Sequence, residues 1–273
     1  MALPPPADSS TALVTGASAG IGAEIARSLA RRGHGVTLTA RREDRLRDLA
    51  AELSDAHGVR AEAIACDLGH ADARDRLAAE VDTRELQVEI LVNNAGFGGF
   101  GSFIEQGREP QVDMVRLNVE AVVDLMGRYV PAMRDRRRGA VVNLASMAAF
   151  QPLPDNATYA ATKAFVLSLG EAVHAELKPD GVTLTTVCPG PVRSEFADVA
   201  GIGGAEERTP GFVWTSPGDV AEQAVDGAEK GKRVVVPGML NQATAMAGQH
   251  SPRMVLLPLA QQIWRRTACG GES

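Results

Sequence analysis

The 273-residue sequence is poor in cysteine, in aromatic residues and in long apolar runs. Its 3 cysteines form no C-x-x-C pair, and no histidine is placed to suggest a zinc module, so neither a disulfide framework nor a metal site is predicted. The longest uncharged stretch, Gly139 to Pro154, contains polar residues and prolines and is shorter than the ~20 apolar residues that a spanning helix requires. Residues 1–10 have neither a basic start nor an apolar core, which predicts a flexible lead rather than a signal peptide. We therefore expect a cytoplasmic protein without a transmembrane segment.

Positively charged residues are also fewer than negatively charged residues. The 28 Lys and Arg residues are outnumbered by 34 Asp and Glu residues, giving a formal net charge of -6. Nucleic-acid-binding proteins usually present a basic field, so we expect no nucleic-acid partner. Hydrophobic residues make up 45% of the chain, which is sufficient for the core of one large domain.

Short apolar runs rich in Val, Ile, Leu and Thr alternate with segments of helical spacing along the chain. This alternation is typical of a parallel sheet with helices on both faces, because parallel neighbours need long crossover connections. We predict a single Rossmann-type domain over residues 1–273, a doubly wound α/β fold with about seven parallel strands and a ligand site beyond their carboxyl ends. The predicted strands are Thr11–Thr15, Val36–Thr39, Val59–Ala65, Glu89–Val92, Ala140–Leu144, Val182–Val187 and Arg233–Val236, and the predicted helices include Ile21–Arg32, Arg42–His57, Asp72–Val81, Gln111–Met126 and Tyr159–Leu177.

Two later segments do not continue the alternation of predicted strands and helices. Segment 195–216, which includes most of the Gly- and Pro-rich stretch that ends at Pro217, is predicted to be a mobile substrate lid. Residues 239–267 are predicted to form two terminal helices, Met239–Gln249 and Pro252–Arg266, with an apolar surface on the second. That surface could pack on its own domain or on a second subunit, cover a hydrophobic substrate, or touch a membrane.

A glycine-rich turn follows the first predicted strand. The sequence T-G-A-S-A-G-I-G places Gly16, Gly20 and Gly22 at the start of the first helix. Glycine permits a tight turn and lets a pyrophosphate approach backbone N–H groups at the positive end of the helix. A purely structural turn is the alternative, but at the start of an alternating strand–helix chain the motif predicts a dinucleotide site.

The end of the second predicted strand bears on which dinucleotide binds. A site for NAD would place an Asp or Glu about 20 residues after the glycines, on the ribose hydroxyl, whereas this chain has Ala40, Arg41 and Arg42. Two guanidinium groups suit a 2′-phosphate, so we predict NADP(H) rather than NAD(H). The neighbouring Glu43 and Asp44 could instead tie the arginines into surface pairs.

Three polar residues follow the fifth predicted strand. Tyr159 and Lys163 are one helical turn apart and so share a helix face. An adjacent ammonium group and an oxidised nicotinamide would both lower the tyrosine pKa from its ordinary ~10 towards the range useful for proton transfer. Ser146 could donate a hydrogen bond to a substrate oxygen as negative charge develops on it. This combination suits proton transfer coupled to hydride transfer at a carbonyl group.

The ordered motifs resemble those of the short-chain dehydrogenase/reductase family, in its compact single-domain branch. The resemblance covers nearly the whole chain, from Thr15 to Val236. It is carried by T-G-A-S-A-G-I-G at Thr15–Gly22, N-N-A-G at Asn93–Gly96, Asn118, Ser146, the Y-x-x-x-K pair Tyr159/Lys163, and P-G-P-V-R-S at Pro189–Ser194.

The resemblance implies a role for each catalytic position. Tyr159 would be the general acid/base, Lys163 would bind the nicotinamide ribose and lower the tyrosine pKa, and Ser146 would hold the substrate oxygen. Asn118 would hold a water that links the lysine to solvent in a proton relay. Asn93 would be mainly structural and join neighbouring strands.

The resemblance also implies a set of cofactor-binding residues. Asp67 would contact the adenine amino group, although an N-cap of the following helix is equally attractive. Val192 and Ser194 would meet the nicotinamide carboxamide, and Ser194 stands where Thr is more frequent. Ala19 stands where many NADP-preferring members have Lys or Arg, which weakens the prediction of NADP(H) without reversing it. The predicted set is Gly16, Ser18, Ala19, Gly20, Ile21, Gly22, Arg41, Arg42, Asp67, Leu68, Asn94, Ala95, Gly96, Tyr159, Lys163, Pro189, Gly190, Val192 and Ser194.

Large apolar side chains gather on the loops beyond the predicted strands and in the predicted lid. They could line a pocket for a hydrophobic ketone or secondary alcohol, or simply anchor the loops. Arg193 and Glu195 could instead recognise a charged or polar substrate. The residues concerned are Phe97, Phe100, Phe103, Met147, Phe150, Phe196, Phe212 and Trp214.

The motifs together predict an NADP(H)-dependent oxidoreductase that acts on small-molecule carbonyl or alcohol groups. The alternative is a catalytically idle, nucleotide-bound sensor or scaffold. The resemblance further implies a homodimer or homotetramer, assembled through the long helices around Gln111–Tyr129 and Tyr159–Leu177.

Overall fold

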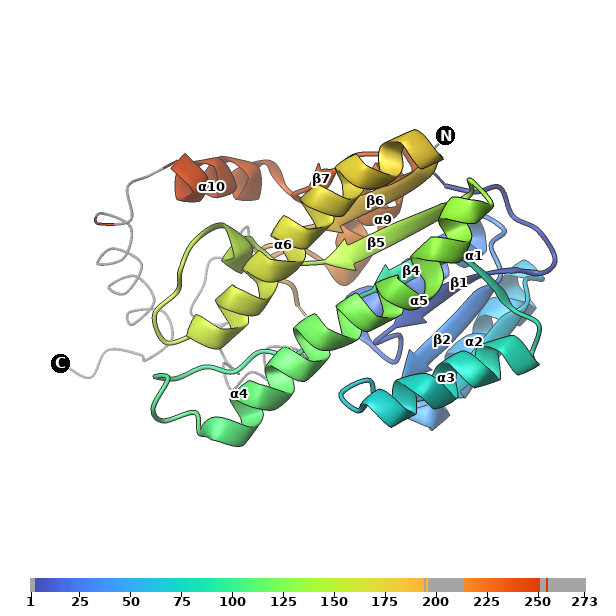
Figure 1. The fold of residues 1–273 in the computed structure, drawn as a ribbon, viewed down its shortest axis with the longest axis horizontal. Coiled ribbons are helices and arrows are strands. Elements are labelled where there is room, and N and C mark those ends of the chain that lie inside the picture. The colour runs from blue at the N-terminus through green and yellow to red at the C-terminus, as the bar shows by residue number, and fades with distance from the viewer. Residues whose placement is uncertain (1–2, 194, 196–213, 251–253, 255–273) are drawn as a thin grey trace.

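The predicted parallel sheet is present, and the seven strands differ from their predicted ends by about one or two residues. The structure is a computed structural model that describes residues 3–193, 195, 214–250 and 254. The strands are β1 (Ser10–Thr15), β2 (Val36–Ala40), β3 (Ala61–Ala65), β4 (Gln87–Asn93), β5 (Gly139–Leu144), β6 (Val182–Val187) and β7 (Val234–Val235). They pair in parallel in the order β3-β2-β1-β4-β5-β6-β7, and Figure 1 shows this order from β2 to β7. The order in which the strands follow along the chain reverses between β1 and β4. Ligands of such sheets bind at this reversal, beyond the carboxyl ends of the strands.

Helices cover both faces of the sheet (Figure 1). One face packs against α1 (Gly20–Arg31), α2 (Glu43–His57) and α9 (Pro217–Glu229). The opposite face packs against α3 (Ala71–Thr83), α5 (Ala121–Asp135) and α6 (Ala157–Leu177). The remaining described elements are α4 (Arg108–Val115), the π-helix η1 (Arg116–Glu120), the 3₁₀ helices η2 (Met147–Phe150) and η3 (Lys178–Asp180), and α10 (Met239–His250).

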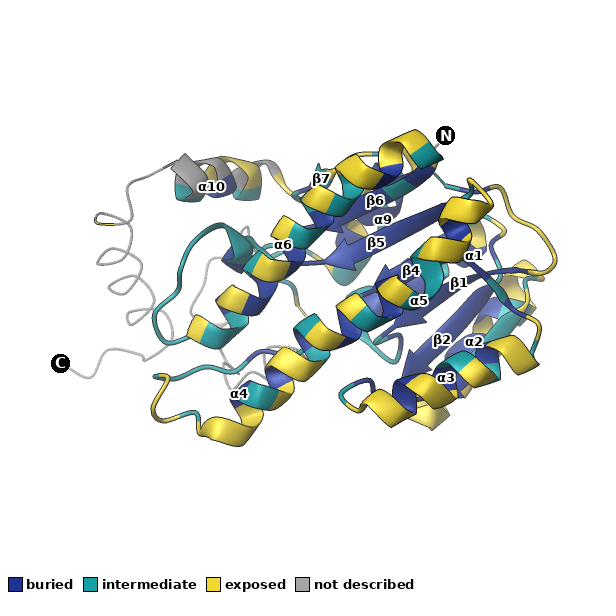
Figure 2. Cartoon of the chain, in the orientation of Figure 1, coloured by how far each residue is buried: buried dark blue, intermediate teal, exposed yellow. Residues whose placement is uncertain are grey.

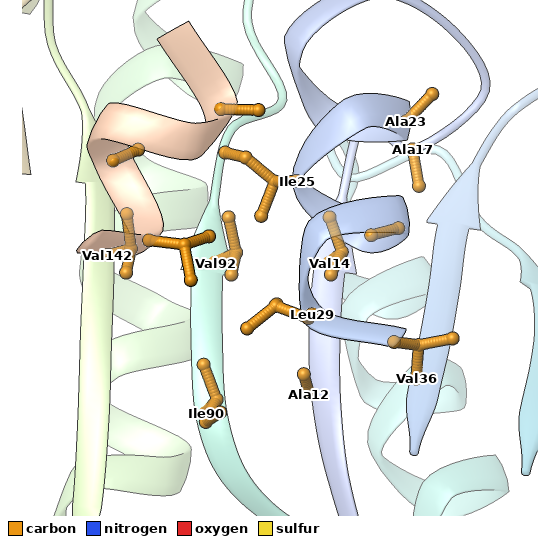
Figure 3. Packing of buried hydrophobic residues seen from close by; sticks show 14 of the residues in the cluster. Ala12, Val14, Ala17, Ala23, Ile25, Leu29, Val36, Ile90, Val92 and Val142 are labelled. Atoms are coloured by element: carbon orange, nitrogen blue, oxygen red, sulfur yellow. The ribbon is translucent and has the colours of Figure 1, made fainter. Parts of the chain in front are cut away.

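The alternation of side chains along each strand divides the core between these two layers. Leu13 of β1 belongs to the layer of α3, α5 and α6, whereas Val14 belongs to the layer of α1, α2 and α9. Figure 3 shows Ile25 and Leu29 of α1 beside Val14 and its neighbours on the sheet. Burying each such Leu or Ile side chain contributes about 1.5–3 kcal/mol. Strands β1, β2 and β5 are therefore buried on both sides, while the outer helix faces remain exposed (Figure 2).

Helix α9 was not among the predicted helices, although its start carries a recognisable signal. Pro217 occupies the first helical position, and the Oγ atom of Ser216 accepts a hydrogen bond of 3.0 Å from the backbone N–H of Asp219. The helix packs against α1, and Arg32 forms ion pairs with Glu222, Asp226 and Glu229. The first helix is thus held by a segment close to 200 residues further along the chain.

The single helix predicted over Gln111–Met126 is wrong in its bounds and its regularity. The helical segment begins at Arg108 and ends at Asp135, and the wider π-helical turn η1 interrupts it at residues 116–120. Such a turn carries an extra residue and is frequent at functional sites. Here it contains Asn118, one of the predicted catalytic residues.

The C-terminal predictions are covered only in part. Of the predicted lid, the structure describes Glu195 and residues 214–216, and the rest lies outside the described residues. The first terminal helix is present as α10, whereas the second, Pro252–Arg266, falls outside them apart from Met254. Among the residues that the structure describes, none of the helices combines the length and the apolar character needed to cross a bilayer.

Candidate active site

The glycine-rich turn packs closely against the N-N-A-G segment that follows β4. Gly16 has a φ of 66°, and a Cβ atom at this position would lie 2.7 Å from Nδ2 of Asn94 and 2.9 Å from the Cα atom of Ala95. Nδ2 of Asn94 in turn donates a hydrogen bond of 2.8 Å to the backbone oxygen of Thr15. Both the backbone conformation and the close approach therefore require glycine at this position.

The start of α1 is open to an anion. Its N-cap is Ala19, which provides no side-chain hydrogen bond to the helix, and the first turn contains no acidic residue. The first N–H groups of a helix have no partner within it and carry a partial positive charge. The start of α1 at residues Ala19 to Gly22 therefore fits the pyrophosphate of a dinucleotide.

Arg42 stands between the glycine-rich turn and α2. Its Nε and Nη2 atoms donate hydrogen bonds of 3.2 and 3.0 Å to Oγ of Ser18, and its Nη1 atom lies 2.7 Å from Oε2 of Glu195. The other carboxylate oxygen of Glu195 lies 2.7 Å from Nη1 of Arg45. These two guanidinium groups lower the pKa of Glu195 to about 2, with Arg45 the stronger influence.

The acidic residues next to the arginines do not form the surface pairs that were the alternative to phosphate binding. Glu43 pairs with Arg47 rather than with Arg41 or Arg42, and Arg41 is exposed. Glu195, considered as a contact for a polar substrate, instead pairs with the arginines of α2. The sequence analysis missed this contact, although Arg45, three residues after Arg42, lies on the same side of the first turn of α2.

Asp67 does not cap a helix, so that alternative for it is wrong. Its Oδ1 atom accepts a hydrogen bond of 3.1 Å from the backbone of Gly69, and the N-cap of α3 is His70. The carboxylate therefore closes a short turn after β3. The neighbouring Leu68 is buried, and its carbonyl oxygen accepts a hydrogen bond of 2.8 Å from Arg74.

Ser146 and Tyr159 are brought together across the gap between η2 and α6. Ser146 is the N-cap of η2, and its Oγ atom accepts a hydrogen bond of 3.1 Å from the backbone N–H of Ala148. Tyr159 lies in the first turn of α6, and its hydroxyl group is hydrogen-bonded to Ser146. Desolvation raises the pKa of Tyr159 to about 12, and the hydrogen bond with Ser146 opposes this rise.

Lys163 lies one turn after Tyr159 and is buried. Its Nζ atom donates a hydrogen bond of 2.8 Å to the backbone oxygen of Leu144 and lies 5.7 Å from the centroid of the Tyr159 ring. Burial lowers the pKa of Lys163 to about 8. In the protein alone, desolvation dominates and raises the pKa of Tyr159, whereas the predicted lowering includes the effect of an oxidised nicotinamide and stays a prediction.

Asn118 connects three segments around this pair. Its Oδ1 atom accepts a hydrogen bond of 3.1 Å from the backbone N–H of Phe97, and its Nδ2 atom donates to the Phe97 oxygen at 2.9 Å. Nδ2 also donates to Oγ1 of Thr162 at 3.1 Å. A Cβ atom on Gly96 would lie 2.9 Å from Oδ1 of Asn118, which explains the glycine there. Sequence reasoning missed Thr162, which has no motif of its own beyond standing next to Lys163.

The remaining predicted positions frame the same edge of the sheet. Nδ2 of Asn93 donates a hydrogen bond of 2.9 Å to Oδ1 of Asn143, which confirms that it joins neighbouring strands. Pro189 accepts a hydrogen bond of 2.9 Å from the backbone of Met147, and Val192 forms a parallel bridge with Thr215.

Gly190 lies against α10, where an added Cβ atom would contact the side chain of Asn241. Ser194 lies outside the described residues.

The family model described as short chain dehydrogenase matches residues 10–201. The chain belongs to the short-chain dehydrogenase/reductase family. A Streptomyces coelicolor protein named as a ketoacyl reductase is 35% identical over 86% of this chain and 95% of its own length. A short-chain dehydrogenase from Sphingobium yanoikuyae, solved in complex with NADPH, is 35% identical with a TM-score of 0.78, covering 88% of this chain and 92% of that one. The bulky-bulky ketone specific alcohol dehydrogenase from Comamonas testosteroni is 30% identical with a TM-score of 0.73, covering 90% and 96%.

Membership of the short-chain dehydrogenase/reductase family makes the chain an oxidoreductase.

The apolar side chains predicted to line its substrate pocket differ in exposure. Phe103 is 65% exposed, and Phe196 and Phe212 lie outside the described residues. The half-buried members are Phe97, Phe100, Met147, Phe150 and Trp214.

Proposed function

We propose that the protein is an NADP(H)-dependent reductase of hydrophobic ketones in which Tyr159 donates the proton. The observation that carries this proposal is the hydrogen bond between Tyr159 and Ser146, with the Lys163 ammonium group 5.7 Å from the tyrosine ring. The chain thereby holds a neutral proton donor and a second hydroxyl group side by side at the carboxyl edge of the sheet. Two hydroxyl groups so placed suit a carbonyl oxygen as the common acceptor.

The residues around the glycine-rich turn fit NADPH. The open start of α1 suits the pyrophosphate, and Arg42, fixed on Ser18, suits the 2′-phosphate. The relative from Sphingobium yanoikuyae, solved with NADPH, supports the same choice. Bound NADPH supplies the hydride that the carbonyl carbon accepts.

The side chains of this chain supply the proton. Ser146 and Tyr159 donate hydrogen bonds to the substrate carbonyl oxygen, which stabilises the negative charge that develops there. The phenolic proton of Tyr159 then moves to that oxygen, so that carbon gains the hydride, oxygen gains the proton and a secondary alcohol results. Because the pKa of Tyr159 is about 12, the phenol is protonated at neutral pH, and this is the form that reduction needs.

The substrate is a ketone with apolar substituents. The half-buried Phe97 follows β4, and the half-buried Met147 and Phe150 lie in η2, which begins directly after Ser146. Aromatic and apolar side chains with a few polar groups are typical of small-molecule pockets. The names of the ketoacyl reductase and of the bulky-bulky ketone specific alcohol dehydrogenase are consistent with this substrate class.

The test follows NADPH oxidation with a panel of aliphatic, aromatic and steroid-like ketones. Tyr159→Phe is expected to lower kcat by about 10³-fold or more while NADPH still binds. Tyr129→Phe is the matched control, because Tyr129 is the second of the chain's 2 tyrosines and burial also raises its pKa to about 12, but it lies on α5. Equal turnover by Tyr159→Phe and wild type would remove the mechanism, and NADPH binding without turnover of any ketone would favour an idle sensor or scaffold.

We further propose a cytoplasmic homodimer or homotetramer. Val115, Val123 and Phe165 are exposed apolar residues of α4, α5 and α6, in the helical segments that the family resemblance assigned to assembly. Exposed apolar side chains on neighbouring helices favour contact with a second copy. Size-exclusion chromatography with light scattering tests this, and a monomer at micromolar concentration would contradict it.

A further inference from the structure

Two arginines at the start of α2 are paired with a carboxylate of the same chain. The two oxygens of the Glu195 carboxylate are shared between Arg42 and Arg45, each at 2.7 Å. Glu195 reaches this place because the segment before it is anchored by backbone hydrogen bonds, from Arg193 to Thr215 at 3.3 Å and from Thr215 to Pro191 at 3.0 Å. The arginine pair is thus neutralised in part by a carboxylate that lies 150 residues or more further along the chain.

The position of this pair relative to the glycine-rich turn identifies the ligand that it suits. In a dinucleotide fold the ribose 2′-substituent lies between that turn and the end of the second strand. Arg42 is the N-cap of α2, two residues after the end of β2, and donates hydrogen bonds to Ser18 of the turn. Arg45 and Glu195 line a cleft of about 440 Å³ together with Ala19. The carboxylate therefore occupies the place where a 2′-phosphate would find its cations.

The charges agree with an exchange of one anion for another. Arg42 and Arg45 carry two positive charges, and Glu195 neutralises one of them. A phosphate monoester carries about −1.5 to −2 charges at pH 7 and three acceptor oxygens, so it matches the pair better than the carboxylate does. The family resemblance gives many NADP-preferring members a Lys or Arg at the position of Ala19. In this chain Arg45 of α2 supplies a cation in its place.

We propose that Glu195 and the 2′-phosphate of NADP(H) compete for Arg42 and Arg45, so that Glu195 is a residue that limits NADP(H) affinity and Arg45 is a second ligand of the phosphate. This inference rests on the proposed use of NADP(H). A ligand whose site is open for only a fraction of the time binds more weakly by that fraction. The two partners of one ion pair are therefore expected to have opposite effects on NADP(H) affinity.

The experiment measures dissociation constants by calorimetry and by NADPH fluorescence, without turnover. The probes are NADPH and NADH, and adenosine 2′,5′-bisphosphate and AMP. Glu195→Gln is expected to bind NADPH and the bisphosphate about three- to tenfold more tightly, and Arg45→Gln about tenfold more weakly. Neither variant is expected to change the affinity for NADH or AMP by more than about twofold.

Two matched variants control for charge. Glu52→Gln removes the same charge from the same cleft, where Glu52 forms a two-point ion pair with Arg27 of α1 at 2.7 Å. Arg47→Gln removes the same charge from α2, where Arg47 pairs with Glu43. Both are expected to leave NADPH affinity within about twofold of wild type.

The outcomes separate this inference from the function on which it rests. If Glu195→Gln weakens NADPH binding together with Arg45→Gln, the carboxylate supports the site rather than competing for it, and the inference is overturned. If Glu195→Gln and wild type bind NADPH equally, Glu195 does not compete, and the inference alone fails. If wild type binds neither NADPH nor the bisphosphate, the proposed use of NADP(H) fails and the inference fails with it.

Discussion

The two ends of the site are built from different interactions. At the nucleotide end, Arg42, Arg45 and Glu195 are exposed side chains joined by ion pairs. At the catalytic end, Asn118 and Lys163 are buried and make hydrogen bonds to backbone oxygens and to a neighbouring hydroxyl group.

This difference follows from what each end has to do. A phosphate brings its own charge, so exposed arginines can bind it in water at modest cost, and salt screens the attraction. Proton transfer needs fixed geometry and a tuned pKa, which buried hydrogen bonds provide because water does not compete with them. Cofactor choice is therefore adjustable by single surface substitutions, whereas the catalytic end tolerates little change.

Replacing one serine at each end should separate the two ends most strongly. Ser146→Ala removes the hydroxyl group beside Tyr159 and is expected to lower kcat by about 10²- to 10³-fold. Ser18→Ala frees Arg42 and is expected to raise the Kd for NADPH by about threefold. Steady-state kinetics and NADPH titration measure both. A Ser146→Ala protein that keeps its kcat would contradict the proposed difference between the two ends.

Two buried asparagines test whether the network around Asn118 is catalytic as well as structural. Asn118→Ala leaves the N–H and C=O groups of Phe97 without their partner and is expected to cost about 2–3 kcal/mol of unfolding free energy and at least tenfold in kcat. Asn93→Ala, which removes the link to Asn143, is expected to cost about 1 kcal/mol and leave kcat nearly unchanged. Urea unfolding and turnover at saturating NADPH are the measurements. Equal kcat values for the two variants would reduce Asn118 to a structural role.

The reaction rates should depend on pH through the groups at the catalytic end alone. Reduction needs the phenol, and the raised pKa of Tyr159 keeps it protonated, so kcat for ketone reduction should stay flat from about pH 6 to 9 and fall above the pKa. Oxidation of the alcohol needs the phenolate, so its rate should rise by up to about tenfold per pH unit over the same range. Lys163, the cation that faces the ring, loses its proton near its pKa of about 8 and cannot enhance the phenolate above that pH. A reductase rate that falls below pH 8 would contradict this assignment.

Salt should act on the nucleotide end alone and gives the smallest effect. Raising the ionic strength from about 0.05 to 0.5 M is expected to weaken NADPH binding by about threefold and NADH binding by less, because screening acts on exposed charges. At saturating NADPH, kcat should not change. Fluorescence titration and initial rates across a salt series check both, and a salt-dependent kcat would show that exposed charges also reach the catalytic end.

Local patterns predicted the fold and the proximity of the candidate catalytic residues, because both follow from short stretches of sequence. The apolar runs identified the seven strands, and the motifs identified Ser146, Tyr159 and Lys163 as neighbours. The π-helical turn at Asn118 could not be predicted, since it accompanies contacts with Phe97 that the helical periodicity does not contain.

Contacts between distant segments and effects of burial were also beyond local patterns. The pairing of Arg45 with Glu195 joins residues 150 positions apart and leaves no repeat or spacing to detect. The pKa of Tyr159 depends on how far its hydroxyl group is withdrawn from water, which the residue type does not state. Both are properties of the assembled molecule.

The packing of α9 on α1 has a consequence for synthesis on the ribosome. The inward face of α1, with Ile25 and Leu29, shares its core with Val220 and Ala224 of α9. A nascent chain that already displays every predicted catalytic residue therefore still exposes an apolar part of its first helix. Such surfaces attract chaperones and other nascent chains. The packing of α1 is thus complete only after residues 217–229 have been translated, so translation stalled before residue 217 would release a chain prone to aggregation rather than a partial enzyme.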